Sequence, residues 1–280
     1  MEKPPEVSIN NIAPTAWMIA YIRTFTNIPY SKEVFEACES LRESDVPEIF
    51  KSPEIAPQIE ARHKLINKLL NESGINQVIE LAAGLSPRGL EMTDNPNFNY
   101  IEIDLPDVYM QKKRIIEMIG KRDNLHVRAG NAMDINTLED GLSLLDSREN
   151  VVIINEGLLR YLNFKEKERV AKTVHEILER FGGLWITPDI SLVKALETEN
   201  SKTKSKIDQI SKRIGINVKS NSFRDIGEAL SFFEELGFSV EEHGFLEVVD
   251  ELVSPERLHQ TKKQAEDLIR ENCVFVMKAI

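Results

Sequence analysis

The sequence predicts an α/β fold with a seven-stranded, mostly parallel sheet, an antiparallel pair of C-terminal strands and a helical cap. From residue 77 onward, short runs rich in β-branched residues alternate with helical patterns, which is typical of parallel strands joined by crossover helices. Near the end of the chain, two further apolar runs can pair antiparallel at an edge of the sheet. A length of 280 residues suits one such domain with a helical attachment.

Five apolar runs have the composition of strands that are buried on both faces. They are QVIEL (77–81), YIEID (100–104), LHVRA (125–129), VVIIN (151–155) and LWITP (184–188). Pro106 predicts the start of a helix after the second run, and Gly120 predicts its end. After the fourth run, Asn163 and Glu166 predict a capped helix start, and Gly182 predicts the end of that helix.

The last part of the chain predicts one helix and two strands. Ile226, Ala229, Leu230 and Phe233 recur at helical spacing within residues 222–236. FSVEEHGF and CVFVMKAI follow as the two strands. A final antiparallel pair distinguishes this order from a dinucleotide-binding sheet, which normally continues parallel.

Two segments lie outside the alternating pattern: residues 1–76, which show helical patterns, and an insertion at about 190–222. We expect both to cap the carboxyl edge of the sheet, with residues 77–280 forming the ligand-binding domain of one compact unit. Within the insertion, the isoleucines at 207, 210 and 214 predict a weakly amphipathic helix. The five Lys of residues 201–220 fit a solvated helix face better than an anion site.

Charge and cysteine content limit the partners and the compartment that we expect. The chain carries 35 basic and 46 acidic side chains, and its net charge of −11 opposes binding to nucleic acid or to anionic membranes. Cys38 and Cys273 show neither metal-ligand nor redox spacing, so we expect no disulfide and no metal site. We also expect neither a signal peptide nor a membrane span, and hence a cytoplasmic protein.

Small and acidic residues after the first two predicted strands suggest a ligand site at the carboxyl edge of the sheet. Ala82 and Gly84 allow the backbone to approach a ligand closely, although they also suit a plain strand-to-helix turn. Asp104, at the tip of the second strand, can bind a ribose diol or can instead cap the helix after Pro106. Glu102 shares a strand face with Asp104 and is the alternative for the ribose role.

The third and fourth strands and an earlier helix add further polar residues. Asn131 follows the third strand, where its side chain can contact an adenine amino group or cap a helix. Glu156 follows a fully apolar strand, and a carboxylate is costly to bury unless it meets a ligand or a cation. Arg62 lies on the apolar stripe of its helix, so its guanidinium needs an anion, either that of a ligand or that of Glu80 or Glu156.

Four ordered segments, ARHKLINKLL (61–70), VIELAAGLSPRGL (78–90), YIEIDLPDVYMQKKRII (100–116) and INEGLLRYL (154–162), resemble the leucine carboxyl methyltransferase family. The similarity is greatest to the bacterial branch of that family, which includes polyketide O-methyltransferases. It covers roughly residues 57–190, and residues 15–31 fit the N-terminal helix of the branch more loosely. The resemblance implies a class I, Rossmann-like methyltransferase fold with S-adenosylmethionine as the cofactor.

The resemblance also implies which residues contact the cofactor: Arg62, Ala82, Gly84, Asp104, Asn131, Ala132 and Glu156. Arg62 would contact the cofactor carboxylate, and Glu156 would lie close to the methionine moiety. The turn from Ala82 to Gly84 would pack on the amino-acid portion, and Asp104 would bind the ribose. Asn131 and Ala132 would flank the adenine.

Three features depart from the family pattern. Ala82 replaces the first residue of a usual Gly-Ala-Gly, so the closeness of cofactor approach there becomes a question. Ser86 and Pro87 stand where the family usually has Asp-Thr. Asn131 replaces the Asp that is common at the adenine position, and its side-chain oxygen can still accept a hydrogen bond from an amino group.

The resemblance implies methyl transfer to an oxygen, that of a carboxylate or a hydroxyl on a small molecule or a peptide end. A carboxylate acceptor needs no general base, whereas a hydroxyl acceptor needs one. Tyr161 and Asp189 are candidates for substrate contact and, with His243, for that base, although each also suits a structural role.

Two other functions stay open at this point. A nicotinamide-dependent oxidoreductase is disfavoured because the chain lacks a G-x-G-x-x-G motif after its first strand. A non-catalytic S-adenosylmethionine-binding protein is suggested only by Ala82. The sequence predicts neither the identity of the acceptor nor the oligomeric state.

Overall fold

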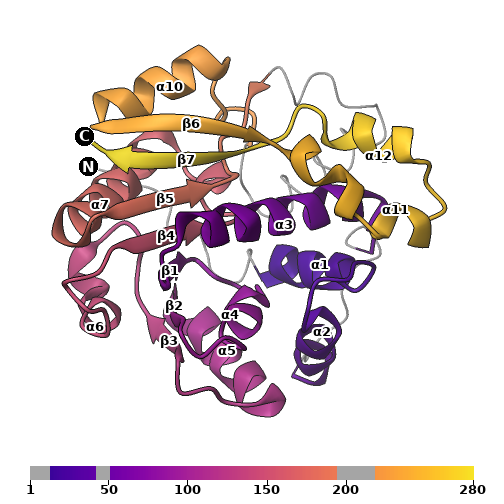
Figure 1. Ribbon diagram of the computed structural model, residues 1–280, viewed down its shortest axis with the longest axis horizontal. Helices are drawn as coiled ribbons and strands as arrows, with labels where there is room; N and C mark the ends of the chain where they lie inside the picture. Colours follow the sequence, from indigo (N-terminus) through magenta and orange to yellow (C-terminus); the bar gives the residue numbers. More distant parts are fainter. Residues whose placement is uncertain (1–12, 42–50, 194–217) are drawn as a thin grey trace, which may run out of the picture.

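The computed structural model describes residues 13–41, 51–193 and 218–280 (Figure 1). The strands in these ranges are β1 (Gln77–Leu81), β2 (Asn99–Asp104), β3 (Leu125–Ala129), β4 (Val151–Asn155), β5 (Gly183–Thr187), β6 (Phe238–Gly244) and β7 (Cys273–Ala279). They form one sheet in the order β3-β2-β1-β4-β5-β7-β6. The first five strands are parallel, and β7 runs antiparallel to both β5 and β6. The predicted mostly parallel seven-stranded sheet with an antiparallel C-terminal pair is therefore confirmed.

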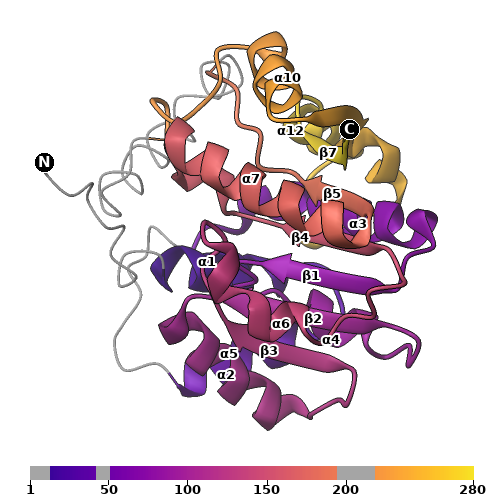
Figure 2. The same ribbon diagram turned by 90° about the vertical axis from the view of Figure 1, so that its left-hand side faces the viewer.

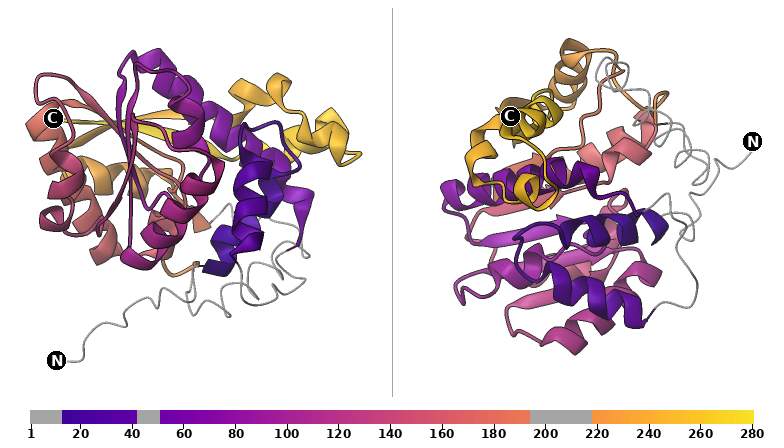
Figure 3. Two further views of the ribbon diagram at one scale, coloured as in Figure 1. Left: turned by 90° about the horizontal axis from the view of Figure 1, so that it is seen from below. Right: turned by 90° about the vertical axis from the view of Figure 1, so that its right-hand side faces the viewer.

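Helices cover both faces of the sheet (Figures 2 and 3). One face carries α3 (Ala56–Ser73), α4 (Arg88–Met92), α5 (Pro106–Ile119) and α12 (Lys262–Ile269). The other carries α6 (Glu139–Leu142), α7 (Phe164–Phe181) and α10 (Ile226–Glu235). Three more helices pack against the first group: α1 (Ala13–Arg23), α2 (Ser31–Ser40) and α11 (Ser254–Arg257). Short 3₁₀ turns are η3 (Pro53–Ile55), η4 (Ile135–Thr137), η5 (Leu159–Tyr161) and η6 (Phe245–Glu251).

Alternating strand residues fill two separate hydrophobic cores. Val78 and Val152 face the layer that contains α3, whereas their neighbours Ile79 and Ile153 face the layer that contains α7. All four side chains are fully buried. This burial explains why the strands appear as continuous apolar runs, since each alternate side chain meets a helix.

The crossover helices begin and end where the sequence predicts. Asn163 accepts a hydrogen bond from the backbone N–H of Glu166, whose own side chain accepts from the N–H of Asn163, and these two bonds form a capping box. Gly182, with a φ of 70°, follows the last residue of α7. Helix α5 runs from Pro106 to the residue before Gly120. Local capping chemistry therefore sets the ends of both helices.

The segment before β6 differs from the prediction. Helix α10 begins at Ile226 and not near residue 222, because the Asp225 side chain caps it by accepting from the N–H of Glu228. Before it, Phe223 forms a parallel bridge with Leu192. Most of the predicted insertion, including its lysine-rich helix, lies outside the described residues.

The N-terminal region is helical in its described parts, and its helices occupy two places. Helix α3 packs along one face of the sheet, with its buried side chains in the same core as β1 and β4. Helix α1 lies beside α3, and its last residue, Arg23, reaches the carboxyl end of β4 (Figure 1). Within the described ranges, no helix combines the length and apolar character that crossing a membrane would require.

Candidate functional site

The carboxyl ends of β1, β2, β4 and β5 meet at one edge of the sheet because these strands are parallel. The chain proceeds outward from β1 through β2 to β3, and then from β4 to β5 on the other side. The order thus reverses between β1 and β4. Ligands of open α/β sheets bind at such a switch point, and the predicted residues Ala82, Asp104 and Glu156 all follow or end strands at this edge.

The turn after β1 has two residues in the left-handed region of backbone conformation. Ala82 has a φ of 53° and Gly84 a φ of 52°. The Ala82 N–H donates to the carbonyl of Ile103 at 2.8 Å, which ties the turn to the end of β2. A Cβ built on Gly84 would meet only a backbone oxygen at 3.9 Å, so protein atoms leave space beside this residue.

Asp104 connects the turn to β2 through its carboxylate. Oδ2 accepts from the Gly84 N–H at 2.7 Å, and Oδ1 accepts from the Leu105 N–H at 2.8 Å. The N-cap position of α5 is occupied by Leu105, which forms no side-chain cap. Asp104 therefore does not act as the N-cap of that helix. Burial raises the pKa of Asp104, although the two backbone bonds oppose that rise. Each oxygen keeps a further lone pair for a ligand hydroxyl.

Glu102 does not share this position. Its carboxylate is buried and lies 3.0 Å from the Nζ of Lys112, whose ammonium also donates to the carbonyl of Ser86. Burial raises its pKa to about 7, and Lys112 opposes this rise. Glu102 therefore supports the turn from behind, and Asp104 is the residue of the pair that we retain for the ribose role.

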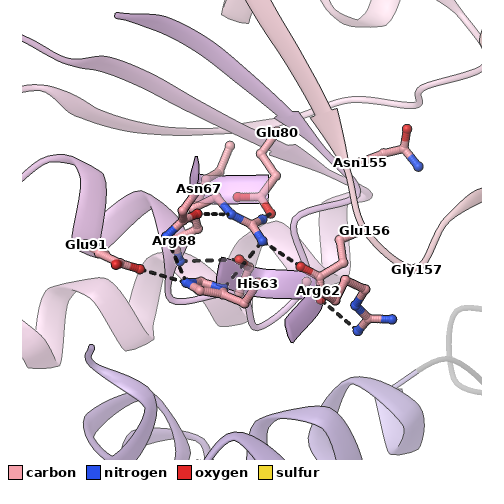
Figure 4. Close-up of polar contacts among 12 residues, drawn as sticks. Arg62, His63, Asn67, Glu80, Arg88, Glu91, Asn155, Glu156 and Gly157 are labelled. Carbon is pink, nitrogen blue, oxygen red and sulfur yellow. Dashed lines mark hydrogen bonds and ion pairs between the residues drawn. The ribbon is translucent and has the colours of Figure 1, made fainter. Parts of the chain in front are cut away.

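Glu156 is bonded by guanidinium groups from three helices, and Figure 4 shows those of Arg62 and Arg88. Arg23 Nη2 donates to Oε1 at 2.8 Å, Arg62 Nη2 lies 2.7 Å from the same oxygen, and Arg88 Nη2 donates to Oε2 at 2.7 Å. The Glu156 side chain is 3% exposed. Burial alone would raise its pKa, but Arg62, Arg23 and Arg88 hold this pKa well below the ordinary value. Of the two predicted partners of Glu156, a ligand or a cation, the cation is therefore confirmed.

The three arginines differ in how completely they are bonded. Arg88 also donates from Nε to Asn67 Oδ1 at 2.9 Å and from Nη1 to Glu80 Oε1 at 2.6 Å. In contrast, the buried Nε atoms of Arg23 and Arg62 have no partner in the described part of the chain. A buried donor without a partner is uncommon in folded proteins. Arg88 is thus a structural partner of the two glutamates, whereas Arg23 and Arg62 keep donors available for a ligand.

A second row of polar residues supports Arg88 from behind. His63, which is 1% exposed, lies with Nε2 2.7 Å from Glu91 and with Nδ1 3.4 Å from Arg88 (Figure 4). Burial and the charge of Arg88 lower the pKa of His63, although Glu91 opposes this shift. A neutral His63 at pH 7 leaves the orientation of Arg88 to hydrogen bonds. No ligand is needed to satisfy this row.

The available donors fit the carboxylate end of S-adenosylmethionine. Two guanidinium groups from α1 and α3 converge on the end of β4 and retain unpartnered N–H groups there. Arginine forks bind carboxylates with charge-assisted bonds. The direct ion pairs hold three arginines against Glu80 and Glu156, which leaves one positive charge for an incoming anion.

Asn131 and Ala132 follow β3 at the same edge. The Asn131 Oδ1 accepts from the Met133 N–H at 3.0 Å, which is a local turn of the kind that the capping alternative describes. Its amide nitrogen has no partner among the described residues and stays available to a ligand. Ala132 is buried beside it. Contact of both residues with adenine stays a prediction.

Asp189 has four donors on its carboxylate. The Asn155 side chain donates to it at 2.8 Å, and the backbone N–H groups of Gly157, Leu158 and Leu159 donate at 2.8, 2.6 and 3.1 Å. Asp189 therefore holds the loop that follows β4. A role for Asp189 in substrate contact stays a prediction, and its carboxylate oxygens already accept these four hydrogen bonds.

The two remaining candidates lie in different places. Tyr161 is the last residue of η5 on the loop after β4, and it is partly buried. His243 lies on β6 with its ring 3.4 Å from Glu241 and 3.3 Å from Glu247. Of these two residues, only Tyr161 belongs to the loop that follows Glu156.

Arg23 is a site residue that the sequence argument did not single out. Its partner Glu156 is 133 residues away, so no local spacing marks the contact. The only available signal was its place within residues 15–31, which fit the N-terminal helix of the resembled family loosely.

Comparisons with known proteins agree with this architecture. The family model of leucine carboxyl methyltransferase matches residues 23–175, which is more than half of the 280-residue chain. The match includes Arg23, Arg62, Asp104 and Glu156. A search of curated protein sequences finds no match.

Several solved structures share the fold. A provisionally assigned methyltransferase from Thermobifida fusca has a TM-score of 0.57 at 16% identity, with 99% of this chain and 98% of that chain covered. A DUF574 family protein from Streptomyces avermitilis has a TM-score of 0.57 at 14% identity, with 95% and 97% covered. A provisionally assigned O-methyltransferase from Nostoc punctiforme has a TM-score of 0.52 at 16% identity, with 95% and 72% covered.

Proposed function

The chain belongs to the leucine carboxyl methyltransferase family and is an S-adenosylmethionine-dependent methyltransferase, and we propose that it methylates an oxygen. We place that oxygen on a carboxylate of a small molecule or a peptide end. When bound, S-adenosylmethionine supplies an activated methyl group on its sulfonium sulfur. The task of the protein is then to bind and align, and alignment alone can lower a barrier by about 7–11 kcal/mol.

The observation that carries the cofactor site is the pair of buried, incompletely bonded arginines beside Glu156. Arg62 and Arg23 hold the cofactor carboxylate, and Glu156 keeps the two cations together in the absence of other anions. Asp104 receives the ribose hydroxyls, and the turn from Ala82 to Gly84 lies along the amino-acid portion. Asn131 and Ala132 flank the adenine.

A carboxylate acceptor is favoured over a hydroxyl because two of the three candidate bases, Asp189 and His243, already bond other groups. Asp189 accepts four hydrogen bonds, and His243 on β6 lies between Glu241 of the same strand and Glu247 of η6. A carboxylate is already the nucleophilic form and needs no proton acceptor. Arg160, on the loop after β4, is partly buried and has no hydrogen bond or ion pair to any described residue. It is available to an anionic acceptor.

The cofactor site is tested by binding of S-adenosylhomocysteine, measured by calorimetry. Arg62→Ala and Asp104→Ala should each weaken the affinity about 10- to 100-fold, since a hydrogen bond to a charged group contributes about 1.5–3 kcal/mol. Lys172→Ala is the control, because its side chain is 65% exposed on α7. Parent-like affinity in both site variants would refute the placement.

The nature of the acceptor is tested by the stability of the product. Methyl-labelled cofactor is incubated with a panel of carboxylic acids and alcohols, and the labelled products are treated with base. Methyl esters release labelled methanol under these conditions, whereas methyl ethers keep the label. Release of the label supports carboxylate methylation, and a base-stable product contradicts it.

A further inference from the structure

Lys167 is a cation inside the core on the side of α7 that faces the candidate site loop. Lys167 as a whole is only 1% exposed to solvent. The ammonium donates to the carbonyl of Leu162 and, at 2.6 Å, to the carbonyl of Asn221. It also lies 5.2 Å from the ring centre of Phe164 and 5.9 Å from that of Phe223. A lysine is almost never buried so fully without a specific set of partners.

These contacts place Lys167 at the end of the loop from Glu156 to Leu162. Asp189 holds the beginning of the same loop through the N–H groups of Gly157, Leu158 and Leu159. The buried carboxylate of Asp189 thus fixes the beginning of the loop by accepting N–H bonds, and the buried ammonium of Lys167 fixes its end by donating to a carbonyl. Tyr161 lies between these two anchors, and Glu156 directly precedes the first of them.

The second carbonyl on Lys167 belongs to the segment from Val218 to Phe223, which leads into α10. Asn221 returns a bond from its side-chain amide to the carbonyl of Tyr161 at 3.2 Å. The backbone of Phe223 bonds to the segment that follows β5. Its carbonyl accepts from the Val193 N–H at 2.8 Å, and its N–H donates to the Ser191 carbonyl at 2.9 Å. The ammonium therefore joins two segments that are distant in sequence at the edge where the acceptor must approach.

We propose that Lys167 is a positioning residue that holds the Glu156–Leu162 loop against the Val218–Phe223 segment and so fixes one wall of the methyl-transfer site. This role rests on the proposed function for its catalytic meaning, but the clamp itself is a property of the fold. A neutral side chain of similar length would leave both carbonyls without a charged donor, in a region where they are shielded from water.

The charge on Lys167 makes the clamp sensitive to pH. Burial lowers the pKa of Lys167 to about 8, while Asp189 after β5 and Glu166 on α7 oppose that shift. Asp189 and Glu166 are the charged groups that act on the ammonium. The clamp should consequently weaken as the pH rises from 7 to 9, since a neutral amine is the poorer hydrogen-bond donor.

Hydrogen exchange followed by mass spectrometry tests the clamp directly. In Lys167→Met, peptides that cover residues 156–162 and 218–223 should exchange about tenfold faster than in the parent. Lys172→Met on the same helix is the matched control, since the Lys172 side chain is 65% exposed, and it should leave both peptides unchanged. Protection equal to the parent in Lys167→Met would overturn the proposal.

Hydrogen exchange measured at several pH values distinguishes a charged clamp from simple packing. This experiment does not depend on whether Lys167→Met folds. After correction for intrinsic exchange, protection of the two peptides in the parent should fall between pH 7 and 9. In Lys167→Arg it should stay flat, because arginine remains charged throughout. A parent that shows no pH dependence contradicts the proposal.

Affinity for S-adenosylhomocysteine connects the clamp to the site. The parent should lose about threefold in affinity between pH 7 and 9 relative to Lys167→Arg, a comparison that cancels titration of the ligand's own amino group. If the parent does not bind the ligand at all, the proposed function fails, and the exchange experiment still decides the role of Lys167. Equal pH profiles in the two proteins would remove Lys167 from the site.

Discussion

Ala82 holds a backbone conformation that favours glycine, at the turn where the resembled family usually has one. Its φ of 53° costs an L-residue about 1–2 kcal/mol. We expect Ala82→Gly to stabilise the fold by up to about 1 kcal/mol, because relief of this strain exceeds the loss of about 0.4–1 kcal/mol from the more flexible unfolded chain. Chemical unfolding measures the change.

The neighbouring residue provides the control for Ala82. Ala83 is buried and has an ordinary negative φ, so Ala83→Gly should destabilise the protein by about 1 kcal/mol. If both glycine variants lose stability equally, Ala82 is not strained. The departure from the family pattern would then need another explanation.

Arg88 and Arg62 both bind the Glu156 carboxylate, but their removal should lower the free energy of unfolding by different amounts. Arg88 is fully buried and bonds both Glu80 and Glu156, so Arg88→Met leaves two buried anions short of a partner and should cost about 3–5 kcal/mol. Arg62→Met leaves Glu156 with Arg23 and Arg88 and should cost only about 1.5–3 kcal/mol, the contribution of one charge-assisted hydrogen bond. Urea unfolding compares the two variants, and equal losses would contradict the division into structural and ligand-binding arginines.

Elements whose ends are set by neighbouring residues could be predicted from the sequence. Asn163 and Gly182 set the two ends of α7 through contacts within a few residues. The strands from β1 to β5 each carry enough apolar residues to be recognised from their own sequence. Helix α10 was placed too early because its apolar spacing continues toward residue 222, whereas Asp225 supplies the cap.

Site residues that depend on distant contacts could not be predicted in the same way. Asp189 was a candidate for chemistry, but its partners are mostly backbone N–H groups, which no sequence pattern displays. Arg23 and Lys167 likewise take their roles from partners that are 133 and 54 positions away. The sequence located the candidate site at the carboxyl edge of the sheet, and the structure separated the arginines that keep unpartnered donors there from the one that is fully bonded.

The buried Glu102–Lys112 pair between β2 and α5 should give the protein a measurable pH dependence of stability. Burial raises the pKa of Glu102 to about 7, against the opposing effect of Lys112. The native state then keeps a proton that the unfolded chain releases near pH 4.5. The contribution of Glu102 to stability is therefore present at low pH and is lost as the pH rises to about 7.

Comparison with Glu102→Gln isolates this contribution. Between pH 5 and 7, the free energy of unfolding of the parent should fall relative to the variant, by at most about 1.4 kcal/mol per pH unit. Glu241→Gln, whose side chain is 69% exposed on β6, should follow the parent at every pH. A constant difference between the parent and Glu102→Gln would show that Glu102 is ionised throughout this range.

At the scale of the whole molecule, the candidate site lies where elements that are distant in sequence meet. Arg23 comes from α1, Arg62 from α3 and Glu156 from the end of β4, so a ligand carboxylate would join an N-terminal helix to the centre of the sheet. Such a ligand binds only the folded chain, and at 100 times its dissociation constant it adds about 2.7 kcal/mol to stability. For a domain of this size, that energy raises the unfolding temperature by roughly 5 °C.

We therefore expect S-adenosylmethionine and S-adenosylhomocysteine to raise the unfolding temperature of the parent and NAD to leave it unchanged. Arg23→Gln should abolish most of the shift, because this substitution removes the only described contact of α1 with Glu156 and one of the two incompletely bonded guanidinium groups. The shift should persist in Lys172→Ala. If NAD stabilises the parent and the sulfonium nucleoside does not, the arginines at the β4 edge serve a nucleotide of another class, because each would then contribute its donors to phosphate oxygens in place of a carboxylate.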